Sequence, residues 1–174
     1  MEDLVKIIEI LSPALQALAG GLIAILGSMA IQRRDHKKEK DEFYRSKIEQ
    51  CYELSLRADE AYSQEELTLA VLVKTKKVSP YITRKLEEGE EGNVVSDKLL
   101  SIIALYLPKL SECAREYQLI EATLAKKKAE IYENYSTLTE DAYEATVKES
   151  FNPLLDKGIE LRALLAEGVK KYAP

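Results

Sequence analysis

The side chains that most often carry out catalysis are scattered in this sequence. His36 is the only histidine, and it stands in a basic run without a nearby serine or cysteine with which to build a nucleophilic site. Cys51 and Cys113 are far apart and form no CxxC or Cys/His group, so neither zinc nor a disulfide framework is indicated. The HExxH, GxxxxGK and GxGxxG motifs are also absent. We therefore expect no catalytic residue, no metal site and no cofactor.

Two residue groups have both a chemical and a structural interpretation. Five glutamates recur at helical spacing, as the carboxylate ligands of a di-iron bundle would, namely Glu112, Glu116, Glu130, Glu133 and Glu140. They lack the Glu-x-x-His elements of such sites, so we expect a solvated surface. Five tyrosines concentrate in the second half of the sequence, namely Tyr106, Tyr117, Tyr132, Tyr135 and Tyr143. Arg115 and Lys126 to Lys128 lie nearby in the sequence. They could stack a nucleobase, but packing at helix interfaces is the simpler interpretation.

Composition places limits on the class of protein. The chain has 174 residues, of which 46% are hydrophobic and 32% charged, which is sufficient for one folded domain beyond the N-terminal segment. The formal net charge is -5. Broad nucleic-acid binding needs a basic surface that displaces counterions, so this balance argues against it.

A long apolar run lies near the N-terminal end of the sequence. Residues 12–31 contain no charged side chain and match the roughly 20 residues with which a helix crosses a bilayer. A cleaved signal peptide is the alternative. However, Glu2, Asp3 and Glu9 precede the run with only one lysine, whereas a signal peptide begins with positive charge. We predict a transmembrane helix within residues 1–34 and a helical domain over residues 35–174.

A basic cluster follows the apolar run. Its members are Arg33, Arg34, Lys37, Lys38 and Lys40. The positive-inside rule places this flank in the cytoplasm, so we expect a single-pass protein of the inner, cytoplasmic membrane with its N-terminus outside. The cluster could also bind anionic lipid headgroups, although a topology signal alone explains it equally well.

The predicted membrane helix has one face that is polar or small. Projected at 100° per residue, this face includes Lys6, Glu9, Gln16, Gly20 and Gly27, opposite a stripe of large apolar residues. Small residues also recur at four-residue spacing in Ala17/Gly21, Gly20/Ala24 and Ala24/Ser28. Polar groups avoid lipid, and small residues let helices approach closely, so we expect a homo-oligomer. A tight dimer or trimer and a ring lined by this face both satisfy the pattern.

The remaining sequence has helical rather than alternating periodicity. We expect the first helix to continue past the basic cluster, and a capping box at Ser63–Glu66 to begin a new helix or a kink. Ser79 and Pro80 predict the start of a short helix that ends at Gly89. Residues 87–94 are typical of a loop.

A long helix should then be capped by Ser96 and bent at Pro108, and a last helix should begin at a capping box over Thr137–Glu140. The predicted fold class is all-α, with a cytoplasmic bundle of about four helices.

This layout resembles the accessory membrane proteins of type VI-B CRISPR systems, which couple one membrane helix to a HEPN-like bundle and assemble into pores. The polar and small face through Glu9, Gln16, Gly20 and Gly27 is the main point of likeness. A HEPN ribonuclease has an arginine four to six residues before a histidine, whereas no arginine precedes His36 at that distance. The resemblance therefore implies a non-enzymatic membrane effector in antiviral defence, and not RNA cleavage.

Two functional hypotheses follow, beside a third in which the bundle cleaves RNA and would depend on His36, a residue that we expect to tolerate substitution. In the first, the chain is an oligomeric membrane effector that acts as a pore or gated channel. In the second, the helix only tethers a bundle that recruits a cytoplasmic protein partner.

Overall fold

All regular structure in the described part of the chain is helical. The computed structural model describes the backbone of residues 2–171 and the side chains of residues 21–85 and 93–170. Its helices are α1 (Glu2–Thr75), α2 (Pro80–Tyr106), α3 (Ser111–Asn134) and α4 (Glu140–Lys171), with a 3-10 turn, η1, at Pro108–Leu110. The all-α prediction is confirmed. The chain divides into two compact units, Met1–Phe43 and Tyr44–Pro174.

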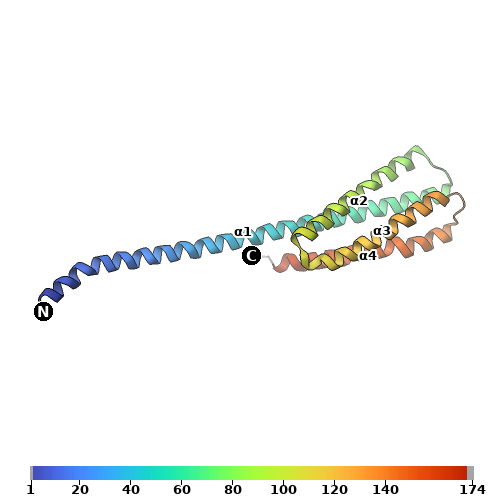
Figure 1. The fold of residues 1–174 in the computed structure, drawn as a ribbon. Coiled ribbons are helices and arrows are strands. Elements are labelled where there is room, and N and C mark those ends of the chain that lie inside the picture. Colours follow the sequence, from blue (N-terminus) through green and yellow to red (C-terminus); the bar gives the residue numbers. More distant parts are fainter. Residues whose placement is uncertain (1, 172–174) are drawn as a thin grey trace. The chain divides into compact units, whose positions relative to one another are not determined.

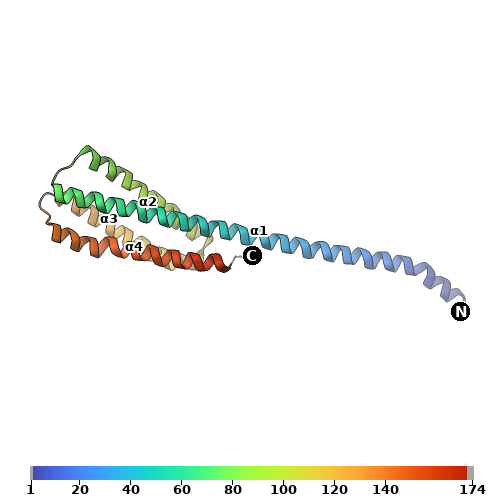
Figure 2. The ribbon, with the colours of Figure 1, turned by 180° about the vertical axis from the view of Figure 1, so that it is seen from behind.

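The second unit is a four-helix bundle. The part of α1 from Tyr44 onward lies beside α2, α3 and α4, and each helix runs opposite to the one before it in the chain (Figure 1; Figure 2). This is the up-down-up-down topology that short connections between helices produce. The prediction of a helical bundle with about four helices is therefore confirmed.

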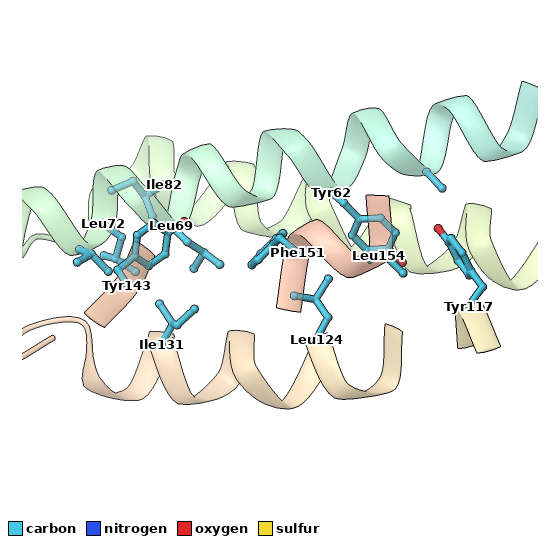
Figure 3. Close-up of a cluster of buried hydrophobic side chains, with 12 residues drawn as sticks. Tyr62, Leu69, Leu72, Ile82, Tyr117, Leu124, Ile131, Tyr143, Phe151 and Leu154 are labelled. Carbon is cyan, nitrogen blue, oxygen red and sulfur yellow. The ribbon is translucent and has the colours of Figure 1, made fainter. Parts of the chain in front are cut away.

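Two apolar clusters fill the bundle. The first is drawn in Figure 3, and its large members are Tyr62, Leu69, Leu72, Ile82, Tyr117, Leu124, Ile131, Tyr143, Phe151 and Leu154. The second contains Ile48, Cys51, Leu54, Leu99, Ile102, Ile103, Leu107, Cys113, Ala114, Leu161 and Leu165. Cys51 and Cys113 are free and lie buried in the second cluster. All four helices contribute to each of the two clusters.

The start of α2 confirms the sequence prediction, and the start of α4 confirms it in part. Ser79 has an extended backbone, and its Oγ accepts a hydrogen bond from the Ile82 amide at 3.3 Å. At α4 the capping oxygen belongs to Thr139, whose Oγ1 accepts from the Ala142 amide at 3.2 Å. Thr137 instead donates to the Asn134 carbonyl at the end of α3, at 3.1 Å. The predicted helix start was right and the predicted cap was wrong.

Three predicted helix boundaries, at Ser63–Glu66, Gly89 and Ser96, and the predicted loop over residues 87–94 were wrong because the helices continue through them. Ser63–Glu66 lies inside α1, where Glu65 is buried against the bundle and Thr68 bonds back to the Gln64 carbonyl. Helix α2 likewise runs past Gly89 and Ser96, and Ser96 is buried in its interior rather than placed at a cap. A glycine costs a helix only about 1 kcal/mol, so the packing of the buried residues that flank this stretch outweighs it.

The bend predicted at Pro108 is a break. Helix α2 ends at Tyr106, and the 3-10 turn η1 separates it from α3. Leu107, with φ -127° and ψ 56°, is no longer helical, although its amide still bonds to the Ile103 carbonyl. Proline disfavours a helical residue before it and lacks an amide donor, so the chain reverses at this point.

The first unit contains the N-terminal part of α1. The predicted membrane span begins at Ser12, and its side chains before Gly21 lie outside the described part of the chain. Where side chains are described, no helical stretch meets the length and hydropathy needed for crossing a bilayer.

Candidate functional site

A run of large apolar side chains is exposed in the first unit. Every side chain from Gly21 to Lys40 is exposed. The large apolar ones are Leu22, Ile23, Ile25, Leu26, Met29 and Ile31, with exposed fractions between 52% and 71%. Contiguous apolar surface of this kind in a protein marks a contact with lipid or with another protein.

The small residues predicted to line a helix contact are only partly described. Ala24 and Gly27 are exposed. A Cβ atom added at Gly27 would meet nothing within 4 Å, so no segment of the described chain uses the space that this glycine leaves open. Lys6, Glu9, Gln16 and Gly20 lie among residues whose side chains are outside the described part, and their role stays a prediction.

The predicted basic cluster lies on the surface of the first unit. Arg33, Arg34, Lys37, Lys38 and Lys40 are all exposed. None of them makes an ion pair with a described residue, whereas the neighbouring His36 lies 3.5 Å from Glu39, measured from Nδ1 to Oε2. These charges are therefore available to a surface outside the chain.

A second polar site lies inside the bundle and was not predicted. The carboxylate of Asp59 on α1 forms an ion pair with Arg162 on α4, and both side chains are largely buried. Arg162 also donates from Nη1 to the Ser55 hydroxyl at 3.0 Å. Burial raises the pKa of Asp59 above its ordinary value, and the hydrogen bond and charge of Arg162 oppose this rise. Arg162 thus joins α1 and α4 through two residues one helical turn apart.

The other two helices extend this polar layer. The Tyr62 hydroxyl on α1 donates to the Glu121 carboxylate on α3, and burial followed by Glu121 raises the pKa of Tyr62. Tyr117 on α3 and Ser96 on α2 are fully buried, and the Ser96 hydroxyl lies close enough to Tyr62 and Tyr117 to oppose the rise that burial causes in the pKa of both. Figure 3 shows the Tyr62 and Tyr117 rings neighbouring each other at one end of the first apolar cluster.

Its location explains what the polar layer does. Its residues lie where the two apolar clusters meet: Ser55 follows Leu54 of the second cluster, Arg162 follows Leu161 of the same cluster, and Tyr62 and Tyr117 belong to the first. Buried polar partners must face each other, so the layer favours one axial alignment of the helices and is suited to specifying register. No cluster of three or more His, Cys, Asp or Glu side chains in the described part could hold a metal ion.

The glutamates and tyrosines with a possible chemical role differ in their burial. The five candidate glutamates, Glu112, Glu116, Glu130, Glu133 and Glu140, are all exposed, as predicted. Tyr117 and Tyr143 are buried and Tyr106 and Tyr135 are half-buried, which confirms packing at helix interfaces for these four, whereas Tyr132 is exposed.

Sequence reasoning missed Asp59 and Arg162 because a charged residue on a helix is usually solvated. The available signal was that Ser55, Asp59 and Tyr62 recur on the face that also carries Leu69, at helical spacing. No family model, no curated protein and no solved structure matches this chain.

Proposed function

We propose that the chain is an oligomeric membrane effector whose N-terminal helix inserts into the inner membrane and associates with copies of itself to form a pore or gate. In this arrangement the bundle lies in the cytoplasm and the polar and small face of residues 6–27 forms the helix contact or the pore lining. The resemblance to CRISPR-associated accessory pores suggests antiviral defence as the setting.

The observation that carries the proposal is the exposed apolar run at residues 22–31, followed at once by exposed basic residues. A hydrocarbon environment would cover the apolar side chains, and anionic headgroups would neutralise the charges beyond them. The uncharged residues 12–20 complete the length that a span requires. The open space at Gly27 suits close approach of a second helix.

The test uses the full-length chain reconstituted into vesicles that hold a small fluorescent dye. Wild-type protein should release the dye, whereas Gly20→Leu and Gly27→Leu should reduce release at least tenfold, because a bulky side chain separates the helices. Ile25→Leu on the opposite, apolar stripe is the matched control and should retain release. Full release by both glycine variants would contradict the proposal.

A tethered adaptor is the second candidate, and a specific feature favours it. Helix α1 carries exposed apolar side chains on the bundle surface, at Tyr52, Leu56, Leu67 and Val71. At 100° per residue they project within about one third of the helix circumference. A cytoplasmic protein partner could bind this stripe.

Replacing residues 12–31 with an unrelated leucine-rich span separates the two functions. An adaptor keeps its cellular activity after the exchange, because its bundle and its anchoring are intact. A pore loses activity, because the helix contacts are gone. The cellular measurement is survival or plaque formation under phage challenge with the chain expressed beside the defence system that it supports.

A further inference from the structure

The segment just beyond the exposed apolar run has its charges divided between two faces. Residues 33–42 are helical and exposed throughout, with one half-buried position at Asp41. At 100° per residue, Arg33, Arg34, Lys37, Lys38 and Lys40 fall within about 160° of the circumference. Asp35, Glu39 and Glu42 fall within about 60° on the other side, and Asp41 is the one acid among the basic residues. The segment therefore has a basic face and an acidic face.

This division places like charges side by side on one helix. Residues four apart are neighbours, and three successive pairs carry like charges, namely Arg33/Lys37, Arg34/Lys38 and Asp35/Glu39. Only the two following pairs, Lys37/Asp41 and Lys38/Glu42, join opposite charges within the helix. None of the five basic residues forms an ion pair with a described residue. A partner of opposite charge on each face would offset both costs.

A second copy of the chain presents the complementary surface at the same height. In parallel copies held in one membrane, residues of equal number lie at one level, and each residue rises 1.5 Å along the axis. Lys38 of one copy and Glu39 of the next therefore differ by about 1.5 Å in height, and Lys37 and Glu39 by about 3 Å. Both separations are within reach of an ion pair between neighbouring helices.

The type of symmetry follows from the two faces. A two-fold dimer of parallel helices brings the same face of both copies together, so the basic face would meet itself. A cyclic assembly brings two different faces together at every contact. Here the centres of the basic and acidic faces are roughly 150° apart at 100° per residue, which exceeds the 60° of a three-membered ring and the 90° of a four-membered one.

We infer that the basic face of residues 33–40 binds the acidic face, Asp35, Glu39 and Glu42, of the next copy, and that these contacts close a ring of more than four subunits. This inference rests on the proposed membrane function and specifies its partner surface. Lipid headgroups surround a spanning helix on every side, so they give no reason for an acidic face opposite the basic one.

Charge exchange tests this contact in the full-length chain. Lys37→Glu with Lys38→Glu places two acids on the basic face, and Glu39→Lys with Glu42→Lys places two lysines on the acidic face; Arg33 and Arg34 are kept as the topology signal. Each double variant should assemble at least tenfold more weakly than wild type. The variant with all four changes retains the net charge and again sets opposite charges at residues 37 and 38 of one copy against residues 39 and 42 of the next, so it should regain the ring. The measurement is protein mass in mild detergent by light scattering, together with cross-linking in native membranes.

Mixing the two double variants provides a second measurement. Copies with acids at residues 37, 38, 39 and 42 and copies with lysines at the same four positions should assemble with each other more strongly than with themselves. If wild type is a large oligomer and the double variants keep its mass, the contact is overturned while the membrane proposal stands. If the fourfold variant stays as weakly assembled as the double variants, the contact is also overturned. That result would show that assembly needs lysine at positions 37 and 38 themselves, as binding to lipid headgroups would require. Wild-type protein that is monomeric and releases no dye would refute the membrane proposal itself.

Discussion

The ion pair between Asp59 and Arg162 joins the first and last helices of the bundle inside its polar layer. Arg162 also binds Ser55, so one guanidinium contacts two positions of α1. Removing one partner of a largely buried pair leaves the other charge without compensation, which costs more than the pair contributes to stability. We expect Asp59→Ala to lower the free energy of unfolding by about 3 kcal/mol.

Urea denaturation of the full chain in mild detergent, followed by circular dichroism, measures this effect. Arg57→Ala changes an exposed charge on the same helix and should cost less than about 0.5 kcal/mol, which makes it the matched control. Replacing both partners with apolar residues, as in Asp59→Leu with Arg162→Met, should recover most of the loss. A double variant as unstable as Asp59→Ala would contradict this explanation.

A glycine makes the close approach of Asp59 to α4 feasible. A Cβ atom built at Gly158 would lie 2.6 Å from the Asp59 Oδ1 atom, a distance that forces the carboxylate to move. Alanine gains about 1 kcal/mol over glycine in a helix, but overpacking typically costs 1–3 kcal/mol and here also disturbs the ion pair. We expect Gly158→Ala to destabilise the bundle by about 1 kcal/mol or more, measured by the same urea titration.

Gly168 on the same helix is the matched control for this substitution. A Cβ atom there would lie 3.2 Å from the Ile48 Cδ1 atom, which is the flexible end of a side chain and can shift. The helix propensity gain should then dominate, so Gly168→Ala should be neutral or stabilising. Equal effects of the two substitutions would show that the Asp59 contact is unimportant.

Two buried tyrosines should respond differently to loss of the hydroxyl. Tyr143 donates to the Glu66 carbonyl at 2.6 Å, so Tyr143→Phe removes a hydrogen bond and leaves a carbonyl less satisfied. This change should cost about 1–2 kcal/mol. The Tyr117 hydroxyl is buried beside the Ser96 hydroxyl in a geometry that falls short of a full hydrogen bond, so Tyr117→Phe should cost less than Tyr143→Phe. A larger loss for Tyr117→Phe than for Tyr143→Phe in thermal unfolding would refute the assignment.

The helical class could be predicted from sequence because it depends on periodicity, which packing then reinforces. The cap at Ser79 was equally predictable, since proline at the first helical position and a serine before it act locally. Local signals failed where tertiary packing decided the outcome. The motif at Ser63–Glu66 could start a helix, but in α1 its surroundings bury Glu65 and Leu69 in the bundle, and the helix continues.

The polar layer could not be predicted for a different reason. Asp59 and Arg162 are distant in sequence, and only the antiparallel alignment of α1 with α4 brings them together. The exposed features of the first unit, by contrast, were visible in the sequence, because charge and hydropathy there follow the chain directly. Which molecule covers those features depends on contacts outside a single chain, and the charge exchange experiment above addresses it.

Cys51 provides a prediction on pH. It is fully buried in the second apolar cluster, and burial raises its pKa from 9.0 to about 11, with the Lys47 charge opposing the rise. The unfolded chain therefore loses this proton at lower pH than the folded chain does. The contribution of the raised pKa to stability is fully present below pH 9 and is lost as the pH rises through about 11.

Wild type should accordingly lose more stability than Cys51→Ala between pH 8 and about 10.5, because alanine has no proton to lose. Comparing the two chains in urea at each pH cancels the titration of tyrosines and lysines that they share. Alkylation gives an independent measurement: the Cys51 thiol should react with iodoacetamide at pH 8 at least tenfold more slowly in the folded chain than in urea, because the reactive thiolate is disfavoured and covered. Rapid alkylation of the folded chain, or parallel pH profiles of the two proteins, would show that Cys51 is accessible to water.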